Sequence, residues 1–188
     1  MIKAFFEDLQ GILDDFKTSD NVYLLRQLKE NLLNCNRVFF CSNGGSHAIA
    51  EHITTDLNKR CGINALTLSN TSLITCLAND YSYENIFIKF LEQNRVTSDD
   101  IIILISSSGR SKNVENVLAK FKDNLETKKT SNPLICCFFA FSGINEIYRD
   151  IPDYYFYINS YNYGCAEIIS ESLLHGIVEE IVYDREKI

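Results

Sequence analysis

The sequence is poor in glycine and proline and has no long hydrophobic run. Eight Gly and two Pro among 188 residues exclude collagen-like and low-complexity proteins. The longest apolar runs, residues 101–105 and 134–141, are far shorter than the roughly 20 apolar residues of a transmembrane helix. The first residues also lack the charged and apolar segments of a secretory signal. We therefore expect a cytoplasmic protein that does not bind membranes.

Positive charge is scarce as well. The chain carries 18 Lys and Arg against 25 Asp and Glu, and the resulting net charge of −7 disfavours binding to nucleic acid. Hydrophobic residues make up 46% of the sequence, which is enough for a sizeable core. At roughly 150 residues per domain, the length predicts one domain over residues 1–188. Its expected parts are N-terminal helices over residues 1–34 and an α/β core over residues 35–188.

The seven cysteines show no CxxC spacing. Cys136 and Cys137 lie inside an apolar run, where a free thiol behaves as a small hydrophobic side chain. Together with the expected cytoplasmic setting, this pattern favours buried thiols over disulfides or a thiolate metal site.

Hydrophobic spacing divides the chain into alternating helices and strands. Within residues 1–34, hydrophobic residues recur at near-helical spacing and predict one or two amphipathic helices. Short apolar runs predict strands over residues 37–41, 64–68, 101–105, 134–141 and 154–158. Further helices are expected over residues 48–57, 72–78, 84–93, 113–121 and 164–182. Strands that are apolar on both faces and alternate with helices predict a three-layer α/β sandwich with a central, doubly wound parallel sheet.

A serine-rich loop follows the third expected strand. Four serines surround a glycine just before a helix, whose free N–H groups and dipole favour an anion; they are Ser106, Ser107, Ser108 and Ser111. The spacing is neither that of a Walker loop nor GxGxxG, which disfavours nucleotide binding. Because the ligand of such a sheet lies beyond the carboxyl ends of its strands, we expect a phosphate here. The alternative is that the loop only turns the chain and caps the helix.

A second polar loop, residues 43–47, follows the first expected strand with the sequence Asn-Gly-Gly-Ser-His. Its two glycines let the backbone approach a ligand closely, while the Asn43 amide and the Ser46 hydroxyl suit sugar oxygens. The nucleophile motif GxSxG is absent, so the serines give no specific support to a hydrolase.

Two of the three histidines are paired with carboxylates at helical spacing. His52 and Asp56 are four residues apart, so both point to one side of their expected helix. Glu167, Glu171 and His175 have the same spacing on the last helix. One His and one carboxylate from each helix would form a four-ligand site suited to Zn²⁺. The alternative is a partly exposed His52 and a solvated glutamate face, because spacing alone does not show that the helices meet.

Four ordered motifs resemble the sugar isomerase (SIS) domain family. They are residues 42–47, residues 77–81, residues 105–114 and the helix that carries Glu167 and His175. More narrowly, the chain is similar to bacterial phosphoheptose isomerases, which convert sedoheptulose 7-phosphate into D-glycero-D-manno-heptose 7-phosphate. The resemblance covers about residues 35–182, and it implies a SIS fold and an aldose–ketose isomerase with a metal-assisted enediol mechanism.

The resemblance also implies roles for individual residues. Asp56 and His175 would move the proton, and one Zn²⁺ per subunit would have four ligands: His52, Asp56, Glu167 and His175. The expected substrate contacts are Asn43, Gly44, Gly45, Ser46, Asn70, Ser106, Ser107, Ser108, Ser111 and Glu167. The family's usual metal ligands are His, Glu, Gln and His, so Asp56 and Glu167 depart from them while keeping an oxygen ligand. Two further positions depart from the family: Asn70 stands where the family commonly has Asp, and Cys165 stands where it commonly has Arg.

Two hypotheses about function follow from this resemblance. The first is a metal-dependent phosphoheptose isomerase or a close relative that acts on another sugar phosphate. For this enzyme the family implies a homotetramer with interfacial active sites, the phosphate loop and the last helix coming from different chains. The second is a non-catalytic SIS protein that binds a phosphosugar or is similar to the replication-initiator-associating adaptor. An adaptor does not need four convergent ligands, so the two retained histidines favour the isomerase.

Overall fold

Five parallel strands form the central sheet within residues 1–127 and 132–187, the part of the chain that the computed structural model describes. The strands are β1 (Val38–Ser42), β2 (Ala65–Thr67), β3 (Ile101–Ser106), β4 (Leu134–Ala140) and β5 (Tyr154–Ile158). Their order is β2-β1-β3-β4-β5, and Val38 lies opposite both Ala65 and Ile101. The order reverses between β1 and β3. A sheet of this kind binds its ligand beyond the carboxyl ends of those two strands.

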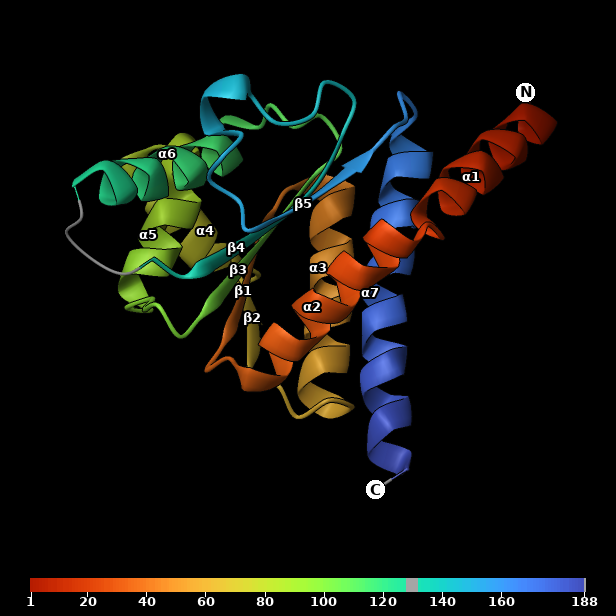
Figure 1. Cartoon of the computed structure of the whole chain (residues 1–188). Helices are drawn as coiled ribbons and strands as arrows, with labels where there is room; N and C mark the ends of the chain where they lie inside the picture. The colour runs from red at the N-terminus through yellow and green to blue at the C-terminus, as the bar shows by residue number, and fades with distance from the viewer. Residues whose placement is uncertain (128–131, 188) are drawn as a thin grey trace.

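Helices cover both faces of the sheet (Figure 1). One layer holds α1 (Ile2–Phe16), α2 (Ser19–Asn34), α3 (Gly44–Lys59) and α7 (Tyr163–Glu186). The other holds α4 (Thr71–Tyr81), α5 (Ile86–Gln93) and α6 (Lys112–Thr127). Two short 3₁₀ helices lie in connecting segments, η1 (Tyr83–Asn85) and η2 (Glu146–Tyr148). Among the described residues, no helix combines the length and the apolar character needed to span a membrane.

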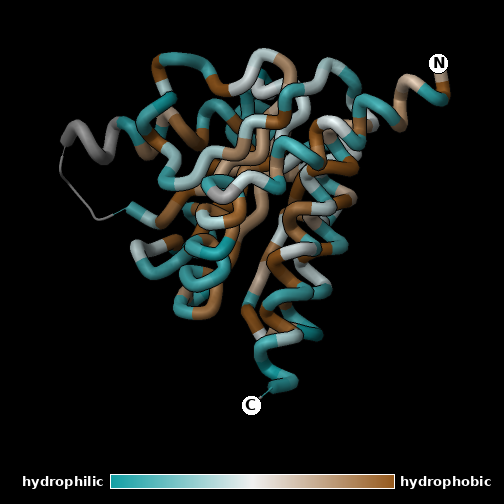
Figure 2. The backbone as a smooth tube through the Cα atoms, turned by 45° about the vertical axis from the view of Figure 1, so that its right-hand side comes forward, coloured by the Kyte–Doolittle hydropathy of each residue, from teal (hydrophilic) through white to brown (hydrophobic). Residues whose placement is uncertain are grey.

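Alternate residues of each strand enter opposite cores. In β1, Val38 and Phe40 pack in the layer of α3 and α7, whereas Phe39 and Cys41 pack in the layer of α4, α5 and α6. Every residue of β1 and β3 is buried. Burial on both faces explains the unbroken apolar runs of the sequence, and Figure 2 shows the strands as the hydrophobic centre of the molecule. The expected α/β sandwich is therefore confirmed.

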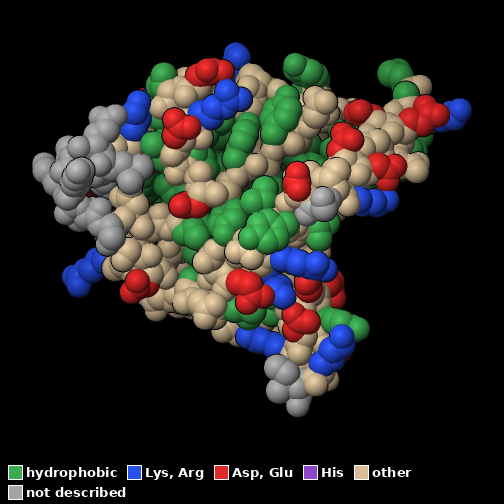
Figure 3. All heavy atoms as spheres, viewed as in Figure 1, with side chains coloured by type: hydrophobic (Ala, Val, Ile, Leu, Met, Phe, Trp, Pro, Cys, Tyr) green, Lys and Arg blue, Asp and Glu red, His purple; other side chains and the backbone are tan. Residues whose placement is uncertain are grey.

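The N-terminal helices belong to the layer of α3 and α7. Phe16 of α1 and both Leu28 and Leu32 of α2 are buried in that core. Charged side chains of both signs gather where α2 meets the C-terminal half of α7 (Figure 3), and there Lys29 pairs with Asp184 at 2.8 Å. Apolar and ionic contacts thus hold these helices on the α/β core.

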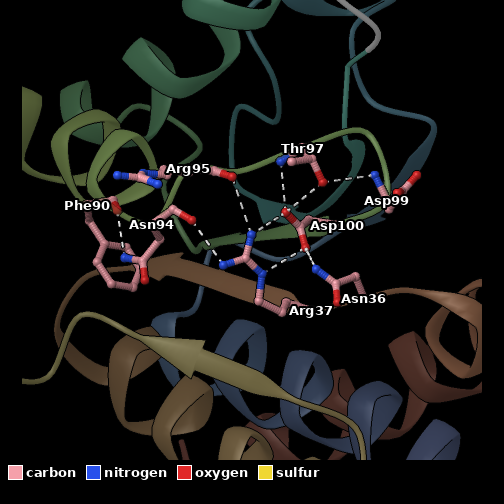
Figure 4. A network of polar contacts seen from close by, with 8 residues as sticks. All are labelled: Asn36, Arg37, Phe90, Asn94, Arg95, Thr97, Asp99 and Asp100. Atoms are coloured by element: carbon pink, nitrogen blue, oxygen red, sulfur yellow. Dashed lines mark hydrogen bonds and ion pairs between the residues drawn. The ribbon is translucent and has the colours of Figure 1, made fainter.

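A buried carboxylate ties the amino ends of β1 and β3 together (Figure 4). Asp100 accepts two hydrogen bonds from Arg37, at 3.0 and 2.8 Å, and one from the Thr97 N–H at 2.8 Å. Arg37 also donates to the Asn94 carbonyl at 2.9 Å. Burial raises the pKa of Asp100, but the hydrogen bonds from Arg37 and Thr97 outweigh it and hold that pKa below its usual range. This network fixes the end of the sheet opposite to the two polar loops.

Helix α3 begins at Gly44, four residues before the expected start at Ala48. Gly44 has a φ of +56°, a conformation that glycine adopts easily, and it turns the chain from β1 directly into the helix. Gly45 and Ser46 therefore lie in the first turn of α3 instead of in a loop.

The thiols agree largely with the expectation of burial. All seven cysteines are free, and five are buried: Cys41, Cys61, Cys136, Cys137 and Cys165. Cys35 is half-buried and Cys76 is exposed. Burial raises the pKa of Cys136 and Cys137 well above the usual value, so these two thiols are held in the protonated, unreactive form.

Candidate functional site

The two polar loops meet at the carboxyl ends of β1 and β3. These strands are neighbours, with Ser42 opposite Ile105, so the residues that follow them lie side by side. A cavity of about 260 Å³ opens there. It is lined by Asn43, Gly44, Gly45, Ser46, Ile105, Ser106, Ser107, Ser108, Ser111, Tyr163 and Glu167. The structure thus brings together all the residues expected to contact substrate, except Asn70.

A pair of asparagines joins the two loops. Asn43 donates to the Asn113 side-chain oxygen at 2.8 Å and accepts from the Asn113 side-chain nitrogen at 2.9 Å. The Tyr83 hydroxyl donates to the Asn43 oxygen at 2.9 Å. Asn43 therefore holds the cavity in shape while its amide is engaged within the protein. Sequence reasoning missed Asn113 and Tyr83. The two asparagines are 70 positions apart in the chain, and only the pairing of β1 with β3 brings them into contact.

The serine loop is shaped by its own hydroxyls. Ser106 Oγ accepts from the Gly109 N–H at 3.1 Å and lies 3.5 Å from Ser111 Oγ. Ser108 Oγ accepts from the Arg110 N–H at 3.2 Å. These bonds are those of the turn-and-cap alternative, yet the same hydroxyls line the cavity just before α6. The N–H groups in the first turn of a helix have no partner within the helix, so the loop is suited to an anion.

Helix α7 closes the cavity with Glu167. The carboxylate of Glu167 lies against Gly45, where a Cβ atom would collide with it. Because glycine leaves this space open, Glu167 reaches the same cavity as the serine loop. In a single chain, α7 and the serine loop therefore already lie together.

A second cluster lies further along α3 and α7, which pack side by side. His52 Nδ1 is 3.1 Å from Glu171 Oε1, and His175 Nε2 is 3.8 Å from the same oxygen. One ligand atom from each of these three residues falls within a span of 4.8 Å, so the group is able to hold a metal ion. Asp56 Oδ2 lies 3.6 Å from His175 Nδ1. Three of the four expected metal ligands are thus together, with Glu171 beside them and Glu167 apart.

Arg60 and Glu179 extend this cluster by one more turn. Arg60 lies 3.4 Å from Asp56 and 2.7 Å from Glu179. The hydrogen bond from Arg60 lowers the pKa of Glu179. Sequence reasoning missed both residues, although each continues the four-residue spacing of its helix. Arg60 therefore links a carboxylate of its own helix, Asp56, to one of α7, Glu179.

Two residues where the sequence departs from its family lie outside the cavity. Asn70 is exposed and caps α4, accepting a hydrogen bond from the Leu73 N–H at 3.0 Å. Cys165 is buried in the first turns of α7, and its thiol faces the carbonyl of Phe5 at 3.9 Å. Neither side chain lines the cavity in the described part of the chain.

Comparisons with known proteins agree with this geometry. Residues 4–124 match the SIS domain family. A phosphoheptose isomerase of Helicobacter pylori strain Shi470 is 42% identical over 102 residues, covering 51% of this chain and 53% of that protein. Its counterpart in strain ATCC 700392 / 26695 is 38% identical over 135 residues, covering 69% and 67%. The alignments thus span about half to two thirds of these relatives.

A solved structure resembles the whole described fold. The phosphoheptose isomerase of Neisseria gonorrhoeae superposes with a TM-score of 0.80 and covers 96% of this chain and 97% of that one. The sequence identity is 22%, so the likeness concerns the fold.

Proposed function

The chain belongs to the SIS domain family, and from this premise we propose that it is an aldose–ketose isomerase of a phosphosugar. The curated relatives are named phosphoheptose isomerases, and the substrate that the family resemblance implies is sedoheptulose 7-phosphate, converted into D-glycero-D-manno-heptose 7-phosphate. One observation carries the proposal: a cavity lined by the serine loop and a histidine–carboxylate cluster lie along the same pair of helices.

The spacing of the two features suits an extended phosphosugar. Gly45 lines the cavity, and His52 is seven residues further along α3. At a rise of about 1.5 Å per residue, this places the cluster about 10 Å from the cavity along the helix axis. A substrate with its phosphate in the serine loop therefore extends its other end toward the cluster.

The cluster contains groups for moving a proton between two carbons. Isomerisation through an enediol requires a base at C1 and C2 and a group that stabilises the charge developing on oxygen. We assign the proton transfer to Asp56 and His175, whose facing atoms are 3.6 Å apart. Arg60 lies 3.4 Å from Asp56 and holds this side chain beside His175.

The donor atoms of the cluster fit a divalent metal, for which we propose one Zn²⁺ per subunit. Zn²⁺ binds imidazole nitrogen and carboxylate oxygen at about 2.1 Å, which sets tetrahedral ligand atoms about 3.4 Å apart. The distances of 3.1 and 3.8 Å from Glu171 to the two histidines lie on either side of that value. When bound, the ion would supply a Lewis acid for the substrate oxygens.

We also propose that the protein is a cytoplasmic homotetramer with its sites near subunit interfaces. The resemblance to the family supports this assembly. Apolar side chains at and just before the start of α1 agree with it, since Met1, Ile2 and Phe6 are each more than half exposed. Their contact with another copy would remove apolar surface from water.

The test is turnover of sedoheptulose 7-phosphate by the purified protein, with and without added Zn²⁺. We expect metal-dependent formation of the aldose, and His175→Ala should lower turnover by about 100-fold or more because it removes a proton-transfer group. Arg149→Ala, an exposed change just after η2, serves as the unaffected control. Binding of the phosphosugar by a folded protein without turnover would contradict the isomerase and favour the non-catalytic SIS hypothesis.

A further inference from the structure

The two carboxylates of the cluster face different nitrogens of the same histidines. Glu171 Oε1 faces Nδ1 of His52 and Nε2 of His175, at 3.1 and 3.8 Å. Asp56 Oδ2 faces the other nitrogen of each ring, Nε2 of His52 at 4.0 Å and Nδ1 of His175 at 3.6 Å. Because the two nitrogens of an imidazole point in different directions, a metal ion beside Glu171 is not also beside Asp56.

Glu167 is kept away from the histidines. Its carboxylate lies against Gly45, seven residues before His52 on α3. Side chains in helices lean toward the helix N-terminus, so Glu167 leans into the cavity, whereas Glu171, one turn later, leans toward His52. The helix geometry thus gives the two glutamates different neighbours.

We infer that the metal ligands of this chain are His52 Nδ1, Glu171 and His175 Nε2, with Asp56 and Glu167 uncoordinated. This assignment rests on the proposed metal-dependent function, and it differs from the set His52, Asp56, Glu167 and His175 that the family resemblance implies. Glu171 takes the place of a ligand one helical turn away, and Glu167 remains with the substrate cavity.

The chemistry of zinc sites supports the division. Catalytic zinc commonly has three protein ligands and an open fourth position. A coordinating histidine commonly donates its other ring N–H to a carboxylate, which is where Asp56 lies relative to His175. Asp56 is then free of the metal. The assignment narrows the proposed base to the Asp56 carboxylate, because the metal and Asp56 engage the two ring nitrogens of His175.

The experiment compares two glutamates on one face of α7. Zn²⁺ affinity of the metal-stripped full chain is measured by competition with a chromophoric chelator, for the unchanged protein, Glu171→Ala and Glu167→Ala. Each substitution removes the donor oxygens of one glutamate and one negative charge, so the general electrostatic effect is shared. We expect Glu171→Ala to weaken binding by at least about tenfold, as loss of a direct ligand should, and Glu167→Ala to change it less than about twofold.

The assignment would be overturned if the Glu167 variant lost more Zn²⁺ affinity than the Glu171 variant, or if both lost the same. It would also be overturned if the unchanged protein bound no Zn²⁺. Absorption of the Co²⁺-substituted protein provides a second readout, because only loss of a ligand changes the coordination spectrum. Asp56→Asn should leave the coordination spectrum of Co²⁺ unchanged, because Asp56 is not among the inferred ligands. If sedoheptulose 7-phosphate is not turned over while the two glutamates behave as expected, the proposed function fails and the ligand assignment stands.

Discussion

Gly109 shows how one residue shapes the serine loop. Its φ is +66°, and a Cβ atom there would run into the backbone carbonyl of Gly143. Rotating a side chain relieves neither the positive φ nor the collision, because both involve only backbone atoms. The loop therefore depends on glycine at this position, while the flexible Glu167 carboxylate beside Gly45 is able to move away.

We predict that Gly109→Ala destabilises the fold by about 1–3 kcal/mol, since it adds a left-handed residue and a backbone collision. Gly11→Ala is the matched control. Gly11 lies inside α1 with nothing within 4 Å of its Cβ position, so this change should stabilise the protein by about 0.5–1 kcal/mol. Urea unfolding of both variants measures the difference. Equal effects of the two substitutions would show that the Gly143 carbonyl moves aside.

At the residue scale, the sequence predicts which side chains have suitable chemistry but not all of their neighbours. The spacing of His52 and Asp56 on one helix and of Glu171 and His175 on another is visible in the sequence. Which glutamate faces His52 is not, because it depends on how α7 lies against α3. Arg60 was missed for the same reason, since its partner Glu179 is on the other helix.

At the scale of elements, the Arg37–Asp100 pair fixes the sheet at the end opposite to the cavity. Asp100 is 1% exposed and its hydrogen bonds join the start of β1, the start of β3 and the turn after α5. The serine loop and the Asn43 loop leave the other ends of the same two strands. A firm register at one end therefore supports the placement of both loops at the other.

We predict that Asp100→Asn lowers the free energy of unfolding at pH 7 by about 1.5–3 kcal/mol, the value of hydrogen bonds to a charged group. The pKa of Asp100 is lowered in the folded state, so its contribution is present above the unfolded pKa of about 3.9 and is lost as pH falls through the folded pKa. Urea unfolding at pH 7, 5 and 3 should show the difference between the two proteins shrinking below about pH 4. A difference that stays constant with pH would contradict this account.

The elements themselves were mostly predictable, because alternation of apolar runs with helical periodicity is strong in this chain. Strand β5 matches its expected range of residues 154–158, and the last helix begins one residue earlier and ends four residues later than expected. The start of α3 was not predicted, since two successive glycines suggest a loop. The positive φ of Gly44 confines the turn to one residue.

At the scale of the whole molecule, the charge of the protein has the same sign as that of the phosphosugar proposed as its substrate. The net charge is −7, and no Lys or Arg lines the cavity among the described residues. Arg110, although it belongs to the serine loop, lines a neighbouring hollow of about 490 Å³ together with Glu115 and Glu146. Neutral hydroxyls and helix N–H groups are therefore the donors available to a phosphate.

The single domain over residues 1–188 stays a prediction that fits the shared core of α1, α2, α3 and α7.

The neutral donors of the cavity predict how salt affects turnover. Raising ionic strength from 0.01 to 0.15 M shortens the Debye length from about 30 to about 8 Å, which weakens the repulsion between an anionic protein and an anionic substrate. We expect kcat/KM for the phosphosugar to stay flat or to rise by about twofold, because no cationic side chain in the cavity loses its attraction. Initial rates over a NaCl series measure this, with Arg110→Gln as the control whose salt profile should match. A tenfold fall with salt that disappears in Arg110→Gln would show instead that Arg110 turns into the cavity to hold the phosphate, so that charge attraction, and not neutral hydrogen bonding, binds the substrate.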